Sequence, residues 1–266
     1  MEKENLTYVE IAINKGPILL KKGERFKALL APFSNYDCSA KFRGDIEKIS
    51  IGSFLGEDIN HPKFKIVDIL WTNISSSLVI DIELMVLDDI SLEEKNIFIL
   101  WKNSFSLARI TLSDKGFIGK REDLSGPLIE SLIKSHLPLC QCLSITIPDN
   151  YHLLLNILTE MAYLKKFDLI ITTGGTGVTE RDITPDATEK IIERRLWGFE
   201  HAIFSEGLKK TKHAIISRAI CGIAKQSLII NLPGSKKAVL ENLSSILPAL
   251  RHILDKIKND PTECGN

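Results

Sequence analysis

The feature that most constrains this chain is a glycine-rich turn that follows a short apolar run. Residues 167–188 read FDLIITTGGTGVTERDITPDAT, with three glycines among the four residues 174–177. Glycine lacks a Cβ, so it adopts positive φ at little cost and lets another group come close to the backbone. We therefore expect these glycines to serve ligand binding rather than packing. Between a strand and a helix, such a loop predicts a phosphate site made of backbone amides, and a tight strand-to-helix turn is the plainer alternative.

The spacing of the glycines excludes two common nucleotide-binding motifs. No lysine follows them at the place that a Walker A loop requires. The order GGxG also differs from the dinucleotide fingerprint GxGxxG, and the acid expected about 20 residues later is absent. Two flanking threonines add hydroxyl donors to the loop. The predicted phosphate cradle therefore consists of Thr173, Gly174, Gly175, Thr176 and Gly177.

The chain changes character near residue 104. Before it, short apolar stretches alternate with turns, and Ile80, Ile82 and Leu84 alternate with charged residues as in a half-buried strand. After it, apolar runs alternate with helical patterns, which is typical of βαβ units and a parallel sheet. We expect a small mainly β domain over residues 1–103, which carries no motif that points to a chemistry, and an α/β domain over residues 104–260.

Four predicted strands of the second domain end in polar or glycine-rich turns. In a mostly parallel sheet flanked by helices, ligands bind outside the carboxyl ends of the strands. One polar turn is weak evidence, because most α/β domains have several, but four such turns predict one shared crevice. The turns are Ser113-Asp114, Pro148-Asp149, Thr173 to Gly177, and Pro233-Gly234-Ser235.

The segment after the glycine loop carries the signals of a helix. Thr184 is the expected N-cap, Pro185 suits the first helical position, and Asp186 complements the positive end of the helix dipole. Gly198 stands where a left-handed residue would end this helix. The last helix of the chain is expected to bend or divide near Pro248, because proline cannot donate the helical hydrogen bond.

Acids follow three of the predicted strands. Asp182, five residues beyond the cradle, would hold Mg²⁺ against phosphate oxygens, since Mg²⁺ uses one or two carboxylates together with substrate phosphates. An Asx-turn or helix-dipole role is the alternative for this residue. Asp149 is either a second magnesium or nucleotide contact or a helix N-cap, and Asp114 caps a turn equally well. Arg218 pairs either with a phosphate or with a surface carboxylate.

The residues that could act as nucleophiles form no recognisable set. We find no Ser-His-Asp signature, and the six histidines are scattered along the chain. Metal-assisted phosphoryl or nucleotidyl transfer needs only positioning and charge stabilisation, which acids and a phosphate cradle supply. The sequence therefore favours this chemistry over attack by a protein nucleophile.

Composition argues against several classes of partner. The 266 residues have a formal net charge of zero, so nothing points to nucleic acid or to an anionic membrane surface. No apolar run approaches the roughly 18–20 residues of a membrane span. The first residues, MEKENLTYVE, are charged, and no apolar signal segment follows them. We therefore expect a cytoplasmic location.

Several short motifs follow one another along the second domain. They are ITLSDKG at 110–116, DLSGP at 123–127, IPDN at 147–150, the stretch 168–188, GFE at 198–200, ISRAICG at 216–222 and LIINLPGS at 228–235. Taken together, these motifs resemble the molybdenum-cofactor biosynthesis family that includes molybdopterin adenylyltransferase. The similarity covers about residues 105–258, and TGGTG followed by RDxTP is its most specific part. The family often has a proline two residues after the glycine of LPG, where this chain has Lys236.

The resemblance implies an α/β domain, usually a homotrimer, that binds the pterin and a nucleotide at the carboxyl edge of its sheet. It implies transfer of AMP from ATP to the terminal phosphate of molybdopterin, with release of pyrophosphate and with Mg²⁺ as cofactor. Carried over by motif, Asp182 and Asp149 are the catalytic acids, Asp182 is the metal ligand, and residues 173–177 cradle the phosphate. Ser113 and Asp114 would line the nucleotide side, and Gly234 and Ser235 the pterin side.

Three other functions remain open from the same motifs. Molybdate-inserting enzymes share this domain, but they carry large additional domains, and about a hundred β-type residues are too few. A non-enzymatic pterin-binding protein would keep the fold without turnover, and the presence of both Asp149 and Asp182 weighs against it. Relatives also include pyrophosphatases and amidases that act on damaged nucleotides. For the adenylyltransferase, the expected partners are ATP, molybdopterin and a molybdate-inserting enzyme that receives the product.

Overall fold

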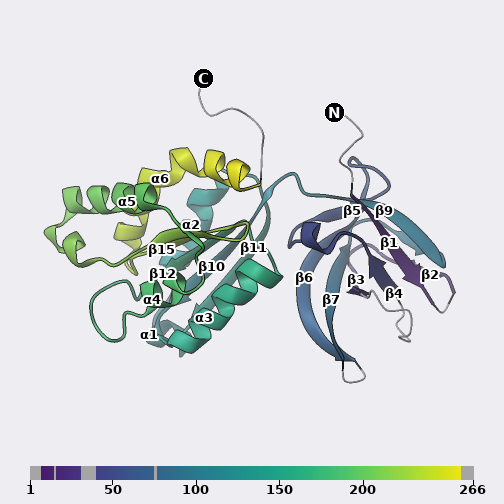
Figure 1. The fold of residues 1–266 in the computed structure, drawn as a ribbon, viewed down its shortest axis with the longest axis horizontal. Helices are drawn as coiled ribbons and strands as arrows, with labels where there is room; N and C mark the ends of the chain where they lie inside the picture. The colour runs from purple at the N-terminus through teal and green to yellow at the C-terminus, as the bar shows by residue number, and fades with distance from the viewer. Residues whose placement is uncertain (1–6, 15, 31–39, 75–76, 259–266) are drawn as a thin grey trace. The chain divides into compact units, whose positions relative to one another are not determined.

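The computed structural model describes residues 7–14, 16–30, 40–74 and 77–258. It divides the chain into two compact units, Met1–Asn103 and Ser104–Asn266. The last two residues of the predicted second domain, 259 and 260, lie outside the described ranges. Each unit is built around its own core, and Figure 1 gives the labels of their elements.

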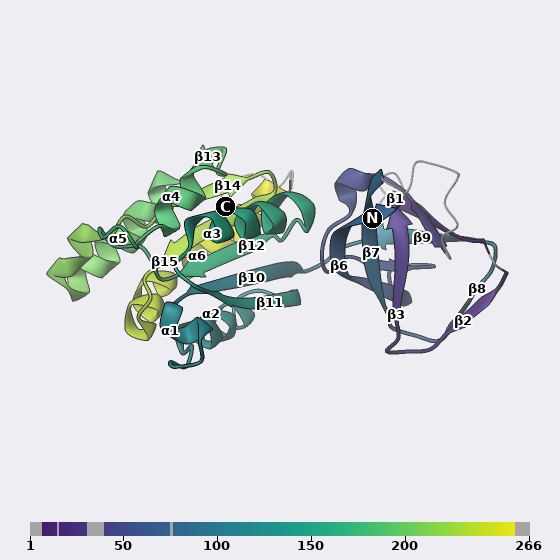
Figure 2. The same ribbon diagram turned by 90° about the horizontal axis from the view of Figure 1, so that it is seen from below.

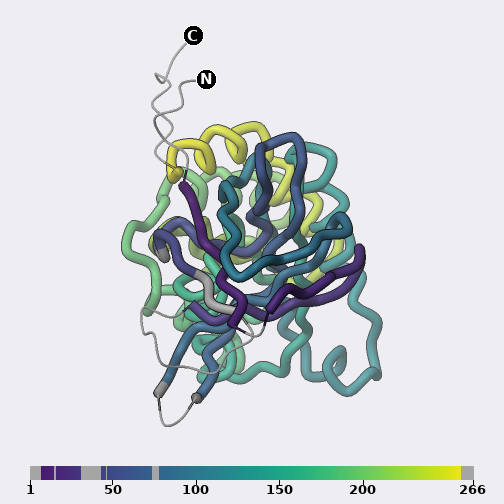
Figure 3. Tube along the Cα trace, turned by 90° about the vertical axis from the view of Figure 1, so that its right-hand side faces the viewer, coloured from purple at the N-terminus to yellow at the C-terminus, as the bar shows by residue number. Residues whose placement is uncertain are grey.

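The first unit is a closed β-barrel, whose course can be followed in Figure 3. Its strands follow each other around the barrel in the order β1-β4-β3-β7-β6-β5-β9, and β9 pairs with β1. Ile82, Leu84 and Val86 alternate along β7 and are buried, which confirms the predicted half-buried strand. The barrel strands are β1 (Thr7–Ile13), β3 (Arg25–Leu30), β4 (Ala40–Arg43), β5 (Phe54–Gly56), β6 (Pro62–Ile74), β7 (Ser77–Val86) and β9 (Lys95–Trp101). The described part also holds a strand pair, β2 (Ile18–Leu20) with β8 (Ile90–Leu92), and a 3₁₀ turn at Ile46–Lys48.

The second unit is built on a six-stranded sheet in the order β11-β10-β12-β15-β14-β13. The first four strands in this order run parallel, and β14 and β13 add an antiparallel edge. Parallel strands buried on both faces read as continuous apolar runs, and every residue of β12 and β15 is buried. The strands are β10 (Phe105–Leu112), β11 (Leu139–Ile147), β12 (Leu169–Thr173), β13 (Arg194–Arg195), β14 (Cys221–Ala224) and β15 (Ser227–Leu232). This confirms the predicted fold class, an α/β region preceded by a mainly β one.

Helices cover both faces of this sheet, as Figures 1 and 2 show. Helices α2, α5 and α6 pack with one face of the sheet into a core that includes Leu107, Ile171 and Ile230, whereas α3 and α4 lie together over the other face. The helices are α1 (Asp114–Phe117), α2 (Ser125–Lys134), α3 (Tyr151–Thr159), the π-helical turn η3 (Glu160–Leu164), α4 (Thr184–Glu189), α5 (Trp197–Lys210), the 3₁₀ helix η4 (Lys212–Ile216) and α6 (Lys236–Ile257). Among helices in the described ranges, none combines the length and apolarity needed to cross a membrane.

Two helix predictions need correction. The helix after the glycine loop does not reach Gly198: α4 ends at Glu189, and Gly198 lies in the first turn of α5. The chain leaves the helix because Arg194 and Arg195 pair with β14 as an edge strand. Ile183 rather than Thr184 is the N-cap of α4. Of the two outcomes expected at Pro248, division does not occur: α6 is one continuous helix, with buried apolar residues on both sides of the proline.

Candidate active site

The carboxyl ends of the parallel strands open into one cleft of about 720 Å³. It is formed by the turns that follow β10, β11, β12 and β15, as the four polar strand ends predict. The structure therefore brings the whole set of sequence-predicted site residues to one place. These residues are Ser113, Asp114, Asp149, Thr173, Gly174, Gly175, Thr176, Gly177, Asp182, Gly234 and Ser235.

The first two glycines of the loop let other parts of the chain approach it closely. Gly174 has φ +100°, and a Cβ there would lie 2.5 Å from the carbonyl oxygen of Leu112. Gly175 has φ +61°, and a Cβ there would lie 2.7 Å from the hydroxyl of Thr184, which donates a 2.7 Å hydrogen bond to the Gly174 carbonyl. The expectation that the glycines serve no packing purpose is therefore wrong. They allow the turn after β12 to pack against the end of β10 and the start of α4.

The amides of the loop are only partly used by the fold. The Gly174 amide donates to Leu232 (3.0 Å), and the Thr173 hydroxyl donates to the Pro233 carbonyl (2.8 Å), so both tie the loop to the end of β15. Within the described residues, no hydrogen bond uses the backbone amides of Gly175 and Thr176. These two amides remain as the donors that the loop offers to an anion.

Asp182 closes the loop on itself. Its Oδ2 accepts hydrogen bonds from the Thr179 amide (2.9 Å) and hydroxyl (2.6 Å), and a Cβ on Gly177 would lie 2.7 Å from the same oxygen. Burial alone would raise the pKa of Asp182, but the hydrogen bonds from Thr179 and Gly177, with the charge of Arg218, lower it overall. The carboxylate is therefore held in its charged form by its own loop.

Arg218 stabilises the same loop through hydrogen bonds to its backbone carbonyls. Its guanidinium donates to the Gly177 carbonyl (2.7 Å) and to the Asp182 carbonyl, and it forms a two-pronged ion pair with Asp186 at 2.9 Å for each oxygen. Planar, two-pronged pairs of this kind are geometrically specific. Of the two predicted roles, the structure shows the carboxylate pair, with two loop carbonyls added to it.

Asp114 and Asp149, which follow β10 and β11, meet in the same cleft; we call them the acid pair. The Asp149 amide donates to Asp114 Oδ1 (3.0 Å), and Nη2 of Arg181 contacts Asp114 Oδ2 and Asp149 Oδ2, the latter at 3.1 Å. Burial raises the pKa of Asp149, and the charge of Asp114 raises it further, whereas Arg181 opposes both. Asn150, not Asp149, is the N-cap of α3, so the capping alternative for Asp149 is wrong. Ser113 caps α1 by accepting from the Gly116 amide (3.0 Å).

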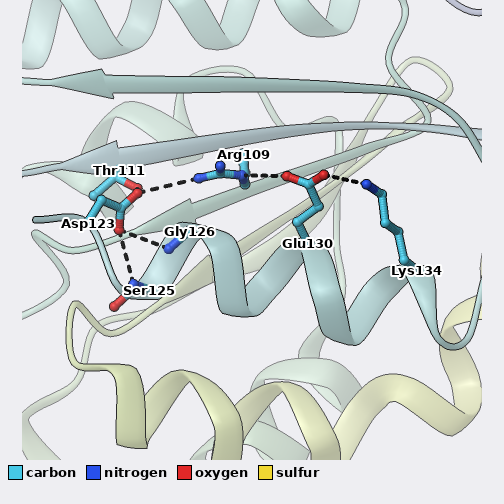
Figure 4. Close-up of polar contacts among 7 residues, drawn as sticks. All are labelled: Arg109, Thr111, Asp123, Ser125, Gly126, Glu130 and Lys134. Carbon is cyan, nitrogen blue, oxygen red and sulfur yellow. Dashed lines mark hydrogen bonds and ion pairs between the residues drawn. The ribbon is translucent and has the colours of Figure 1, made fainter.

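The turn of the DLSGP motif is organised by Asp123, as Figure 4 shows. One carboxylate oxygen accepts from the amides of Ser125 (3.1 Å) and Gly126 (2.9 Å) at the start of α2, and the other accepts from the Thr111 hydroxyl (2.7 Å). The Ser125 hydroxyl then donates to the Gly234 carbonyl (3.0 Å). The motif thus joins the turn after β10 to the turn after β15.

Arg109, on β10, extends this network to Glu130 and Lys134 on α2 (Figure 4). It lies 3.4 Å from Asp123 and 3.2 Å from Glu130, and Glu130 pairs with Lys134 at 2.6 Å. A Cβ on Gly126 would lie 1.9 Å from the Arg109 guanidinium, so glycine is needed at that position for the arginine to pass. The arginine side chain is 11% exposed, and its pairs are therefore screened less than surface pairs.

The turn after β15 begins α6 at the edge of the cleft. Ser235 is the N-cap of α6 and accepts from the Ala238 amide (3.2 Å), and Gly234 packs so closely on Gly174 that a Cβ would lie 3.3 Å from its Cα. Lys236, where the resembling family often has proline, also lines the cleft. A helix N-terminus with a lysine beside it favours an anionic ligand group.

Sequence reasoning missed four of the residues that shape the cleft. Arg181, Asp123, Ser125 and Lys236 all line it, yet none was assigned a role in advance. The signals for two of them were present: Asp-x-Ser-Gly before a helical pattern is typical of a side chain that accepts from the next turn, and Arg181 directly precedes the predicted acid Asp182. Nothing in the sequence alone indicated that Arg181 would reach the acid pair.

The cleft has the chemistry of a site for phosphorylated ligands and a divalent cation. Carboxylates from Asp114, Asp149 and Asp182 supply the hard oxygen donors that Mg²⁺ prefers. Lys115, Arg121, Arg181 and Lys236, with the loop amides, supply positive charge and hydrogen-bond donors for phosphates. Among its lining residues there is no histidine or cysteine. Positioning and charge stabilisation of a transferring phosphoryl group suit this set of residues.

Comparison with known proteins identifies the domain. A family model for a probable molybdopterin binding domain matches residues 108–252. Molybdopterin adenylyltransferase of Helicobacter pylori is 40% identical over 150 residues, which cover 56% of this chain and 85% of that protein. Gephyrin of Dictyostelium discoideum is 42% identical over 57% of this chain, and the molybdenum cofactor synthesis protein cinnamon of Drosophila melanogaster is 35% identical over 59%. The matched part spans only 22% and 26% of the lengths of these two relatives.

Solved structures agree with the sequence matches. The molybdopterin biosynthesis enzyme MoaB of Thermus thermophilus is 35% identical, with a TM-score of 0.54, over 58% of this chain and 97% of that one. A molybdopterin biosynthesis protein of Mycobacterium abscessus is 28% identical, with a TM-score of 0.55, over 59% of this chain and 99% of that one. The family model covers more than half of the chain and lies within the second compact unit. The chain therefore belongs to the family defined by the probable molybdopterin binding domain.

Proposed function

We propose that residues 104–260 form a nucleotidyltransferase domain that transfers AMP from ATP to the terminal phosphate of molybdopterin, with release of pyrophosphate. The observation that carries this proposal is the single cleft in which the glycine loop, the acid pair and the start of α6 meet. A molybdopterin adenylyltransferase is also among the relatives that this chain covers over most of their length. In the reaction, an oxygen of the pterin phosphate attacks the α-phosphorus of ATP, and the bond to the pyrophosphate oxygen breaks.

The residues of the cleft divide the work of binding. The amides of Gly175 and Thr176, with Thr173 and the glycines around them, cradle a phosphate group. Ser113 and Asp114, at the end of β10, face the nucleotide, and Gly234 and Ser235, at the start of α6, face the pterin. The dipole of α6 and the charge of Lys236 favour the anionic end of the pterin side chain.

The donor set of the cleft fits Mg²⁺. Asp149 and Asp182 are the proposed catalytic acids, and Asp182 is the proposed metal ligand. Among the described residues, no group of three or more His, Cys, Asp or Glu side chains could hold a metal ion by itself, but Mg²⁺ needs only one or two carboxylates together with substrate phosphates. When bound there, Mg²⁺ supplies charge neutralisation for the phosphate oxygens. The side chains of this domain orient the phosphates and hold the two reacting groups together, which lowers the entropic cost of their meeting.

A direct assay tests the proposal. The full chain is given molybdopterin, ATP and Mg²⁺, and pyrophosphate release is followed together with the adenylylated pterin. We expect pyrophosphate only when both substrates are present. Intact protein that releases none would contradict the transferase, and binding of molybdopterin without turnover would favour the non-enzymatic carrier instead. In a parallel reaction with molybdate added, a product that contains molybdenum would favour molybdate insertion.

The proposed homotrimer has one structural support. A second cavity, of about 630 Å³, lies among α5, η4 and α6, next to large exposed apolar side chains that include Trp197, Ile215 and Ile216. Exposed apolar surface of this kind is typical of protein interfaces. Light scattering would show whether the chain is a trimer.

We further propose that the protein is located in the cytoplasm. We also propose that it hands its product over to a molybdate-inserting enzyme.

A further inference from the structure

We propose that Arg181 competes with a divalent cation for Asp114 and Asp149, and that it turns to the phosphates of the ligand when the cation takes its place. This inference goes beyond the proposed reaction, because it assigns a positioning role to a residue outside the predicted site. It rests on the proposed function for the identity of the ligands, a nucleoside triphosphate with a divalent cation.

The first step of the argument is the shared contact. A single nitrogen, Nη2 of Arg181, contacts Asp114 Oδ2 and Asp149 Oδ2. The Asp149 amide donates to the other oxygen of Asp114. One guanidinium therefore holds together two carboxylates that come from the turns after β10 and β11, while its own backbone belongs to the turn after β12. Without it, the two carboxylates would repel each other.

The second step is the difference in exposure between the arginine and one of the acids. The Arg181 side chain is 67% exposed, whereas the Asp149 side chain is 19% exposed. An exposed ion pair contributes little to the stability of a fold, so its long side chain can leave without unfolding the loop. Arg218 makes the contrast clear, because it is fastened to two loop carbonyls and to Asp186. Of these two arginines, Arg181 is the one free to move.

The third step is competition for the same oxygens. A cation that binds the acid pair must take the carboxylate oxygens that Arg181 now contacts. When the cation displaces the guanidinium, the long Arg181 side chain still lies in the cleft that holds the glycine loop. Its planar fork of donors matches phosphate oxygens. Removal of Arg181 should therefore strengthen cation binding measured without nucleotide and weaken nucleotide binding.

The experiment measures Mn²⁺ binding by electron paramagnetic resonance with the full chain, without nucleotide. Arg181→Gln should bind Mn²⁺ about fivefold more tightly than the native chain, the size expected for loss of an exposed ion pair. Arg25→Gln is the matched control, because Arg25 pairs with Glu83 at 2.8 Å, is 62% exposed and lies in the barrel. It should leave the affinity unchanged, and Asp149→Asn should abolish the site. Unchanged or weaker Mn²⁺ binding by Arg181→Gln would overturn the inference.

A second titration tests the phosphate half. With Mn²⁺ saturating, Arg181→Gln should bind ATP about tenfold more weakly, as expected for loss of one charge-assisted contact, and Arg181→Lys should recover part of the affinity. Equal ATP affinity for the native chain and Arg181→Gln would overturn the proposed contact of Arg181 with the phosphates. If the Gln variant does not fold, Arg181→Met takes its place. Neither titration needs molybdopterin, so a chain that behaves as stated here but makes no pyrophosphate would contradict only the proposed reaction.

Discussion

The carboxylates of the glycine loop and of the acid pair, which share the cleft, are held by different means. On the glycine-loop side, Asp182 is held by the amide and hydroxyl of Thr179, which belong to its own loop. On the acid-pair side, Asp114 and Asp149 are held by Arg181, which extends from another turn and is largely exposed. The first carboxylate is part of the structure of the loop. The second set is neutralised by a side chain that a cation can replace.

This difference indicates which carboxylate can exchange its present partner for a metal ion. Asp182 contributes to the shape of the glycine loop whatever its role in catalysis, because its hydrogen bonds close the loop that carries Gly177. The partner of the Asp149 carboxylate is instead the Arg181 side chain, which is largely exposed and comes from another turn. We therefore expect metal binding to depend more on the acid pair than on Asp182, and the predictions below test that order.

The largest effect is expected from Asp149→Asn. The substitution keeps the shape of the side chain and the backbone bond to Asp114 but removes one charge of the acid pair. We expect kcat to fall roughly a thousandfold, as for loss of a main electrostatic contact, with the melting temperature nearly unchanged. Steady-state kinetics and thermal denaturation measure both. A folded variant that retains more than a tenth of native kcat would remove Asp149 from the catalytic set.

A smaller loss is expected from Asp182→Asn. The amide can still accept from Thr179, so the fold and pterin binding should persist, while kcat falls roughly a hundredfold with the loss of charge beside the cradle. Kinetics and equilibrium binding of molybdopterin measure the two effects. Turnover within a few-fold of the native rate would show that Asp182 only closes the loop. A loss greater than that of Asp149→Asn would reverse the order of the two sides.

The smallest effect is expected on the stability of the fold, from substitution of Arg218, which holds the glycine loop. Arg218 lowers the pKa of Asp186, chiefly through their hydrogen bonds, from an ordinary value of 3.8. A lowered pKa stabilises the fold above the ordinary value, and that stability is lost as the pH falls through the folded value. Arg218→Gln should therefore destabilise the chain at neutral pH and bring it closer to the native chain below about pH 3.8. Denaturant melts at both pH values measure this; an equal difference at both would contradict it.

Much of the fold and the location of the site could be predicted because they depend on local patterns. Alternating apolar residues gave the half-buried strand of β7, and continuous apolar runs gave the parallel strands. Polar turns after four of those strands were enough to place the cleft, because the carboxyl ends of parallel strands meet at one edge. The glycine motif marked the turn between β12 and α4 for the same reason.

What could not be predicted depends on contacts between residues far apart in the chain. The end of α4 at Glu189 follows from the pairing of Arg194 and Arg195 with β14, which local helix signals do not contain. The contact of Arg181 with Asp114 joins residues 67 positions apart. The packing role of Gly174 became visible only with the end of β10 beside it. None of these three contacts can be read from the residues next to it in the sequence.

Transfer of a labelled phosphorus tests the central claim most directly. The chain is incubated with Mg²⁺, molybdopterin and ATP labelled either on the α- or on the γ-phosphorus, and the pterin and pyrophosphate are separated. The proposed reaction predicts α-label on the pterin and γ-label in pyrophosphate, at equal rates. Label on neither product, or γ-label on the pterin, would contradict adenylyl transfer by this domain.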